Sequence, residues 1–106
     1  MERTGFLLKV KKDRLDEYKR RHEKIWPEML DAIQRNGFRN YSIFLDEEGN
    51  LFGYVEAEES WEKCLESMSN EEANLRWQAD MADFFESLSG RPDQSITKLE
   101  HVFYSP

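Results

Sequence analysis

Apolar and polar residues alternate along four short stretches of the chain, which is the pattern of half-buried β-strands. We predict strands over residues 5–11, 40–46, 51–58 and 97–104. Only the turn-forming residues 47–50, which include a glycine, separate the second stretch from the third. These two strands are therefore expected to pair as a hairpin.

A different period runs through residues 13–36, where apolar or ring-bearing side chains recur every three or four positions. The stripe consists of Leu15, Tyr18, His22, Ile25, Trp26, Met29, Leu30 and Ile33. We predict one long helix that is kinked by Pro27, because proline lacks an N–H and its ring clashes with the carbonyl oxygen of Glu23. The helix is expected to stop at Asn36-Gly37.

Two further helices are predicted between the hairpin and the last strand. The first covers residues 59–68, and the second follows a capping box formed by Ser69 and Glu72. The element order is then βαββαβ, which is typical of a ferredoxin-like α+β fold with helices on one face of a four-stranded antiparallel sheet. We expect residues 1–106 to form a single domain.

The uncovered face of such a sheet would still carry large apolar side chains. They are Phe44, Phe52, Tyr54 and either Phe103 or Tyr104. An exposed apolar patch of this size usually marks a contact with a partner. We therefore predict a two-fold homodimer of the dimeric α/β-barrel type, which packs sheet against sheet.

Charge and cysteine content limit the classes of partner and the cellular compartment that we expect. The formal net charge is −7, and residues 1–27 are basic while the rest of the chain is strongly acidic. The acidic excess argues against a nucleic-acid partner, and no apolar run approaches membrane-spanning length. Cys64 is the only cysteine and the first residues show no signal-peptide pattern, so we expect a protein of the reducing cytoplasm without a disulfide.

His22 is the candidate catalytic residue, because it lies in the middle of the inward stripe, one helical turn from Tyr18. A lone histidine on an apolar face is more often a hydrogen-bonded core residue than a catalyst, and this alternative stays open. Trp26 would supply a flat apolar wall, and a kink at Pro27 would open space beside the imidazole.

Further candidates are expected at the same end of the sheet. Tyr41 begins the second strand, and Trp77 lies on the inward side of the last helix with Gln78 next to it. Aromatic walls with a few polar groups are typical of small-molecule sites, although ordinary core packing would explain Tyr41 or Trp77 taken singly. The chain has no metal-binding motif, phosphate-binding glycine loop or dinucleotide fingerprint, so we expect acid–base chemistry without metal or cofactor.

Several blocks of the sequence resemble the L-rhamnose mutarotase family. They are Tyr18-x-x-Arg21-His22, Ile25-Trp26-Pro27-Glu28, Asn40-Tyr41-Ser42-Ile43, Arg76-Trp77 and Glu100-x-Val102-Phe103-Tyr104-x-Pro106. The resemblance covers nearly the whole chain. It implies a cytoplasmic homodimer of ferredoxin-like chains, an isomerase that interconverts the α and β anomers of L-rhamnopyranose without a cofactor.

The resemblance also implies roles for individual residues. By matched position, His22 would be the proton donor. Tyr18, Tyr41 and Trp77 would contact the sugar. Gln78 stands where members of the enterobacterial type have the second tryptophan of a Trp-Trp pair, so L-fucose or another deoxy sugar remains an alternative substrate.

The chemistry of mutarotation fits an imidazole. The sugar ring opens at the anomeric carbon and closes from the other face, which needs one proton delivered to the ring oxygen and one removed from the anomeric hydroxyl. An imidazole with a pKa near ~6.5 can serve both directions at neutral pH. The hypothesis from sequence is that His22 is the acid, with Tyr18 or a bound water as the base.

Two other classes of protein stay open. Dimeric ferredoxin-like domains also include small monooxygenases and haem-handling proteins, in which His22 would bind haem or the pocket would take a flat aromatic substrate. A non-catalytic sugar-binding module would bind its ligand without accelerating anomer exchange.

Overall fold

The sheet of this protein has four antiparallel strands in the order β2-β3-β1-β4. The computed structural model describes residues 1–86, 88 and 90–106. The strands are β1 (Glu2–Lys9), β2 (Phe38–Leu45), β3 (Asn50–Ala57) and β4 (Thr97–Leu99). This strand order and the succession of elements confirm the predicted ferredoxin-like α+β fold.

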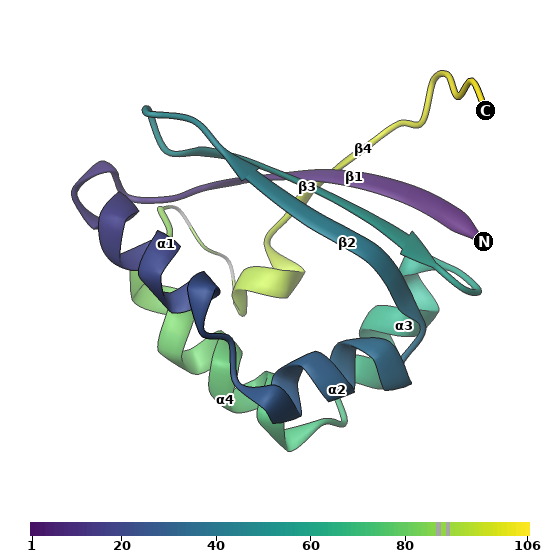
Figure 1. Ribbon diagram of the computed structural model, residues 1–106, viewed down its shortest axis with the longest axis horizontal. Helices are drawn as coiled ribbons and strands as arrows, with labels where there is room; N and C mark the ends of the chain where they lie inside the picture. Colours follow the sequence, from purple (N-terminus) through teal and green to yellow (C-terminus); the bar gives the residue numbers. More distant parts are fainter. Residues whose placement is uncertain (87, 89) are drawn as a thin grey trace.

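The α-helices of the described residues lie on one side of the sheet (Figure 1). They are α1 (Leu15–Glu23), α2 (Pro27–Arg35), α3 (Trp61–Met68) and α4 (Glu72–Met81), with short 3-10 turns η1 (Lys12–Arg14), η2 (Ala82–Phe84) and η3 (Pro92–Gln94). The buried core lies between this helical layer and the sheet and is rich in aromatic side chains. Within the described residues, no helix has both the length and the apolar character needed to cross a membrane.

The predicted helix over residues 13–36 is in fact two helices, so the prediction of a single kinked helix was wrong. α1 ends at Glu23, and Trp26 has an extended conformation with φ −55° and ψ 134°. Pro27 forms the first turn of α2, where its missing N–H costs no hydrogen bond. The residue before a proline is pushed out of the helical region, so the chain turns a corner here instead of bending.

The predicted capping box was also wrong. Ser69 follows α3, and its hydroxyl donates a hydrogen bond to the carbonyl oxygen of Leu65 at 3.0 Å. Glu71 is the residue that precedes α4, and its carboxylate accepts two hydrogen bonds from the Arg35 guanidinium at 2.9 and 3.0 Å. The start of α4 is thus tied to the end of α2 by an ion pair.

The last strand begins where it was predicted but is shorter. Only Thr97–Leu99 pairs with β1, and residues 100–106 form an irregular arm that leads away from the sheet (Figure 1). Val102 and Phe103 on this arm are 86% and 80% exposed. The Arg3 guanidinium lies 3.6 Å from the centre of the Tyr104 ring, a cation–π contact that ties the arm to β1.

The expected apolar face is present on the side of the sheet away from the helices. Leu7 and Phe44 are 41% and 60% exposed. The rings of Phe44 and Phe52 stack with their centres 6.2 Å apart, which joins β2 to β3 on this outer face. A monomer therefore leaves a contiguous aromatic surface in water.

Candidate active site

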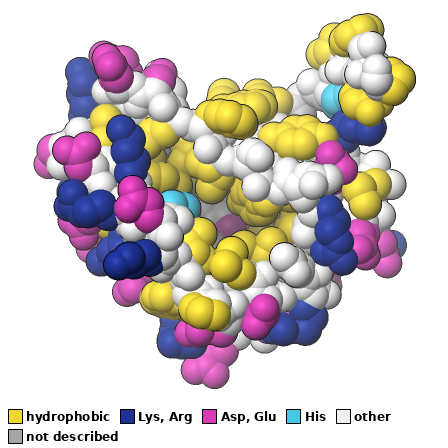
Figure 2. Space-filling model, viewed as in Figure 1, with side chains coloured by type: hydrophobic (Ala, Val, Ile, Leu, Met, Phe, Trp, Pro, Cys, Tyr) yellow, Lys and Arg dark blue, Asp and Glu magenta, His cyan; other side chains and the backbone are white. Residues whose placement is uncertain are grey.

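A cavity of about 720 Å³ opens between the helices and the β2 side of the sheet. It appears in Figure 2 as a hollow lined largely by hydrophobic side chains. An inner pocket of about 70 Å³ adjoins it and reaches toward the core. His22, Tyr41, Trp77 and Gln78 line both spaces, and Tyr18 lines the inner pocket. The fold therefore brings all five predicted site residues together, from α1, β2 and α4.

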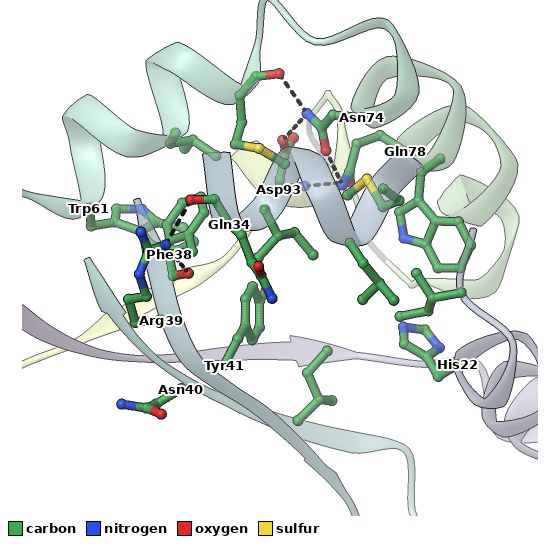
Figure 3. A pocket seen from close by; sticks show the side chains of 18 residues that line it. His22, Gln34, Phe38, Arg39, Asn40, Tyr41, Trp61, Asn74, Gln78 and Asp93 are labelled. Carbon is green, nitrogen blue, oxygen red and sulfur yellow. Dashed lines mark hydrogen bonds between the residues drawn. The ribbon is translucent and has the colours of Figure 1, made fainter. Parts of the chain in front are cut away.

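His22 enters the cavity from the last turn of α1 (Figure 3). Its Nδ1 lies 2.9 Å from the carbonyl oxygen of Tyr18. A carbonyl oxygen only accepts hydrogen bonds, so Nδ1 carries the hydrogen and Nε2 carries a lone pair when the ring is neutral. Burial lowers the pKa of His22 below its ordinary value, and this effect exceeds the opposing effect of the hydrogen bond. The imidazole is therefore neutral at pH 7.

Aromatic rings hold the imidazole of His22 from two sides. The Tyr18 ring lies 4.3 Å away, tilted by 32°, and the Trp77 ring lies 5.5 Å away at 83°. Trp26 packs edge-to-face on Trp77 at 5.2 Å and fixes the indole in turn. Arg76, the neighbour of Trp77, lies behind this group with its guanidinium 5.3 Å from the Trp26 ring and does not line the cavity.

Tyr41 reaches the cavity because β2 contains a β-bulge. The pairing of β2 with β3 shifts between Arg39 and Ser42, and Asn40 has a left-handed φ of 49°. The extra residue lets Phe38 and Tyr41, three positions apart, turn to the same face with ring centres 6.1 Å apart. A regular strand would place them on opposite faces. The sequence does not predict the bulge, because its alternation of side chains is typical of a regular strand that begins at Asn40.

Both tyrosine hydroxyls stay protonated at neutral pH. Burial raises the pKa of Tyr18, and the nearby Tyr41 raises it further. Burial also raises the pKa of Tyr41, with a second contribution from the negative charge of Asp93. These phenols are therefore hydrogen donors, and this state does not suit Tyr18 to the role of base that the sequence suggested.

A network of polar side chains, which sequence reasoning missed, forms the helical side of the cavity (Figure 3). Gln78 Nε2 donates a hydrogen bond to Asn74 Oδ1, and the Asp93 N–H donates to Gln78 Oε1, both at 3.1 Å. Asn74 Nδ2 in turn donates to Asp93 Oδ2 at 3.3 Å. The spacing of Asn74 and Gln78, one turn apart on α4, could have revealed the first contact. Nothing in the sequence signals Asp93, because the fold brings it from a distant turn.

The polar and aromatic groups around the cavity are a neutral imidazole, two phenols, amides, indoles, the carboxylate of Asp93 and the guanidinium of Arg39. They can exchange hydrogen bonds with a ligand rich in hydroxyl groups and can transfer protons to and from it. Among residues 1–86, 88 and 90–106, no three His, Cys, Asp or Glu side chains gather as a set of metal ligands.

Known proteins resemble this chain over its whole length. A model of the family described as L-rhamnose mutarotase matches residues 3–105. The L-rhamnose mutarotase of Bacillus subtilis (strain 168) is 42% identical over 107 residues, and the alignment covers 98% of each chain. The L-rhamnose mutarotase of Tolumonas auensis is also 42% identical, over 109 residues and 98% of each chain.

Solved structures agree with these matches. The crystal structure of an L-rhamnose mutarotase from Formosa agariphila has a TM-score of 0.79 and 33% identity, and all of both chains is covered. A candidate antibiotic biosynthesis monooxygenase from Nitrosomonas europaea has a TM-score of 0.64 at 14% identity, over 98% of this chain and 92% of its own. The second likeness shows a common fold alone. The family match and the full-length relatives together show that the chain belongs to the L-rhamnose mutarotase family.

Proposed function

We propose that this protein is a mutarotase that interconverts the α and β anomers of L-rhamnopyranose without a cofactor. Family membership supports the substrate and the reaction. The single observation that carries the mechanism is the imidazole of His22, whose Nδ1 is held by the carbonyl oxygen of Tyr18 while the ring lines the cavity. This arrangement provides a positioned base in an aromatic pocket.

In the proposed reaction, His22 acts first as the base. Nε2 takes the proton of the anomeric hydroxyl, the bond between the anomeric carbon and the ring oxygen breaks, and an aldehyde forms. The ring oxygen takes a proton from an acid as it leaves. Rotation of the aldehyde and the reverse of these steps on its other face give the other anomer and return both protons. This order reverses the sequence-based hypothesis of His22 as the first acid, because the buried ring is neutral at pH 7.

Tyr41 is the better placed of the two tyrosines to be the acid. It lines the large cavity together with His22, whereas Tyr18 lines only the inner pocket. Its raised pKa keeps the hydroxyl protonated before the ring opens. The Trp77 indole, which lines the cavity beside His22, would pack against the apolar C–H face of the sugar.

NMR saturation transfer between the two anomers of L-rhamnose tests the proposal. Wild-type protein is expected to accelerate exchange above the buffer rate, and His22→Ala to lose about 10²–10⁴-fold of that acceleration. His101→Ala, a change to an exposed histidine outside the cavity, is the matched control and is expected to keep full activity. Sugar binding without faster exchange in the wild type would instead indicate a binding module.

The preferred sugar is tested by the same measurement on L-rhamnose, L-fucose and L-lyxose. Gln78 lines the cavity at the position where family members of the enterobacterial type carry a tryptophan. Because this difference alters the wall of the cavity, the preference between L-rhamnose and another deoxy sugar needs to be measured. Faster exchange of L-fucose than of L-rhamnose would make L-fucose the preferred substrate, while the proposed type of reaction would stay the same.

We further propose that two copies pair through the outer face of the sheet, around Phe44 and Phe52. The support is the exposure of these stacked rings and of the apolar side chains on the arm of residues 100–106. We also propose a cytoplasmic location, which a buried free thiol at Cys64 suits.

A further inference from the structure

Asp93 places a carboxylate on the wall of the proposed sugar cavity. It belongs to the short turn η3, and it lines both the large cavity and the inner pocket. Its side chain is only 13% exposed. In Figure 3 it lies beside Asn74 and Gln78, in the same cavity as Tyr41 and His22. A nearly buried carboxylate in a ligand cavity needs hydrogen-bond donors to offset the loss of water.

Protein groups supply some of those donors and fix the carboxylate in place. Arg91 Nε donates to Oδ1 at 3.0 Å, and Asn74 Nδ2 donates to Oδ2 at 3.3 Å. Each carboxylate oxygen can accept two hydrogen bonds, so these contacts leave acceptor capacity for a ligand. The turn itself is held by the bond from the Asp93 N–H to Gln78 Oε1.

The chemistry of this wall restricts what can bind. A carboxylate accepts hydrogen bonds from hydroxyl groups. Its negative charge also acts on Tyr41, whose pKa it helps to raise, so the carboxylate and the phenol share one part of the cavity. Arg91 already pairs with this carboxylate, and the Arg39 guanidinium also lines the cavity, so a sugar hydroxyl is a suitable further donor to Asp93.

We propose that Asp93 accepts a hydrogen bond from a ring hydroxyl of the sugar substrate. This inference rests on the proposed mutarotase function and adds a binding residue to it. Gln78 then acts as a positioning residue. Both ends of its amide are bonded to Asn74 and Asp93, so it holds the Asp93 turn against α4.

Asp93→Asn tests the proposal, because it keeps the shape of the side chain and removes the charge. The exchange kinetics of L-rhamnose are compared with those of its analogues that lack the hydroxyl at C2, C3 or C4. We expect Asp93→Asn to raise KM for L-rhamnose about ten- to hundredfold, the usual effect of losing a hydrogen bond to a charged group. On the one analogue that lacks the bonded hydroxyl, wild type and variant are expected to be equal.

Two further variants distinguish a direct contact between Asp93 and the sugar from a purely structural role of Asp93. Asp83→Asn alters an exposed aspartate of η2 and is expected to leave all four substrates unaffected. Gln78→Leu keeps the Asp93 carboxylate but removes the hydrogen bond from the Asp93 N–H to Gln78 Oε1. This variant is expected to raise KM selectively for the sugars that retain the bonded hydroxyl. Thermal unfolding of each variant shows whether it is folded. If Asp93→Asn does not fold, the KM values of Gln78→Leu test the proposal instead.

The outcomes distinguish this inference from the function on which it rests. Equal losses of kcat/KM on L-rhamnose and on all three analogues would assign Asp93 a structural role and overturn the inference. An unchanged KM for L-rhamnose in folded Asp93→Asn would overturn it as well. A wild-type protein that fails to accelerate anomer exchange would overturn the proposed function itself.

Discussion

The protonation of a single imidazole sets the pH dependence of the proposed reaction. Burial lowers the pKa of His22 below its ordinary value, so the neutral base predominates at pH 7 and is lost as the pH falls through the lowered pKa. We expect kcat/KM for anomer exchange to be constant from pH 7 to 8. It should fall about tenfold per unit only at pH values below 6.5. An activity that increases on acidification would contradict His22 as the base.

A second prediction at the scale of the residue concerns Thr4, which is 1% exposed on the inner face of β1. Its hydroxyl has no hydrogen-bond partner among the described residues. Thr4→Val keeps the shape and removes the unpaired hydroxyl, so the free energy of unfolding should rise by about 1 kcal/mol in urea denaturation. Thr97→Val, on the exposed edge strand, is the control and should change it by less than about 0.5 kcal/mol. A clear loss of stability in Thr4→Val would show that the hydroxyl is paired.

The residues of the site differ in how far the sequence could reveal them. Tyr18 and His22 are one turn apart on a helix, so their contact follows from local geometry alone. Tyr41 was found, although the bulge that turns it inward was not. Asp93 could not be found, because its place in the cavity depends on a turn that packs against α4 through Gln78, a contact between distant parts of the chain.

At the scale of the element, the bulge in β2 depends on the backbone of Asn40, at φ 49°. Asparagine and glycine tolerate this left-handed conformation, whereas a β-branched residue does not. Asn40→Val should therefore lower the free energy of unfolding by about 1–2 kcal/mol, while Asn40→Gly should be close to neutral. Ser42→Val, at an exposed regular position of the same strand, controls for the added apolar side chain. Equal effects of Asn40→Val and Asn40→Gly would show that the conformation is not strained.

The errors at this scale both concern the ends of helices. The stripe of apolar residues continues through residues 24–26, so periodicity alone predicted a single helix, while Pro27 and its effect on Trp26 ended α1 early. Ser69 has the sequence of a helix cap but bonds to the preceding helix. A backbone preference decided the first outcome, and a hydrogen bond from the Ser69 side chain to the preceding helix accompanies the second.

At the scale of the whole molecule, the order of elements was enough to predict the fold. Alternation in the strands and the helical stripe specify which faces are buried, and the sheet order follows from the βαββαβ sequence. The length of β4 did not follow, because the apolar residues of the arm continue the strand-like pattern without pairing. The apolar side chains of the arm and of the outer face of the sheet are therefore exposed to water in a single chain.

The proposed homodimer gives the last prediction. Phe44 is 60% exposed on β2, on the outer face of the sheet, where a charge would be buried by sheet-to-sheet packing. Phe44→Glu should therefore convert a wild-type dimer to a monomer in sedimentation velocity. Leu75→Glu changes a 42% exposed leucine on the helical side and should remain dimeric. Since one chain supplies all five predicted site residues, the monomeric variant should keep anomer exchange within a few fold. A wild-type protein that sediments as a monomer would remove this surface from consideration as an interface between copies.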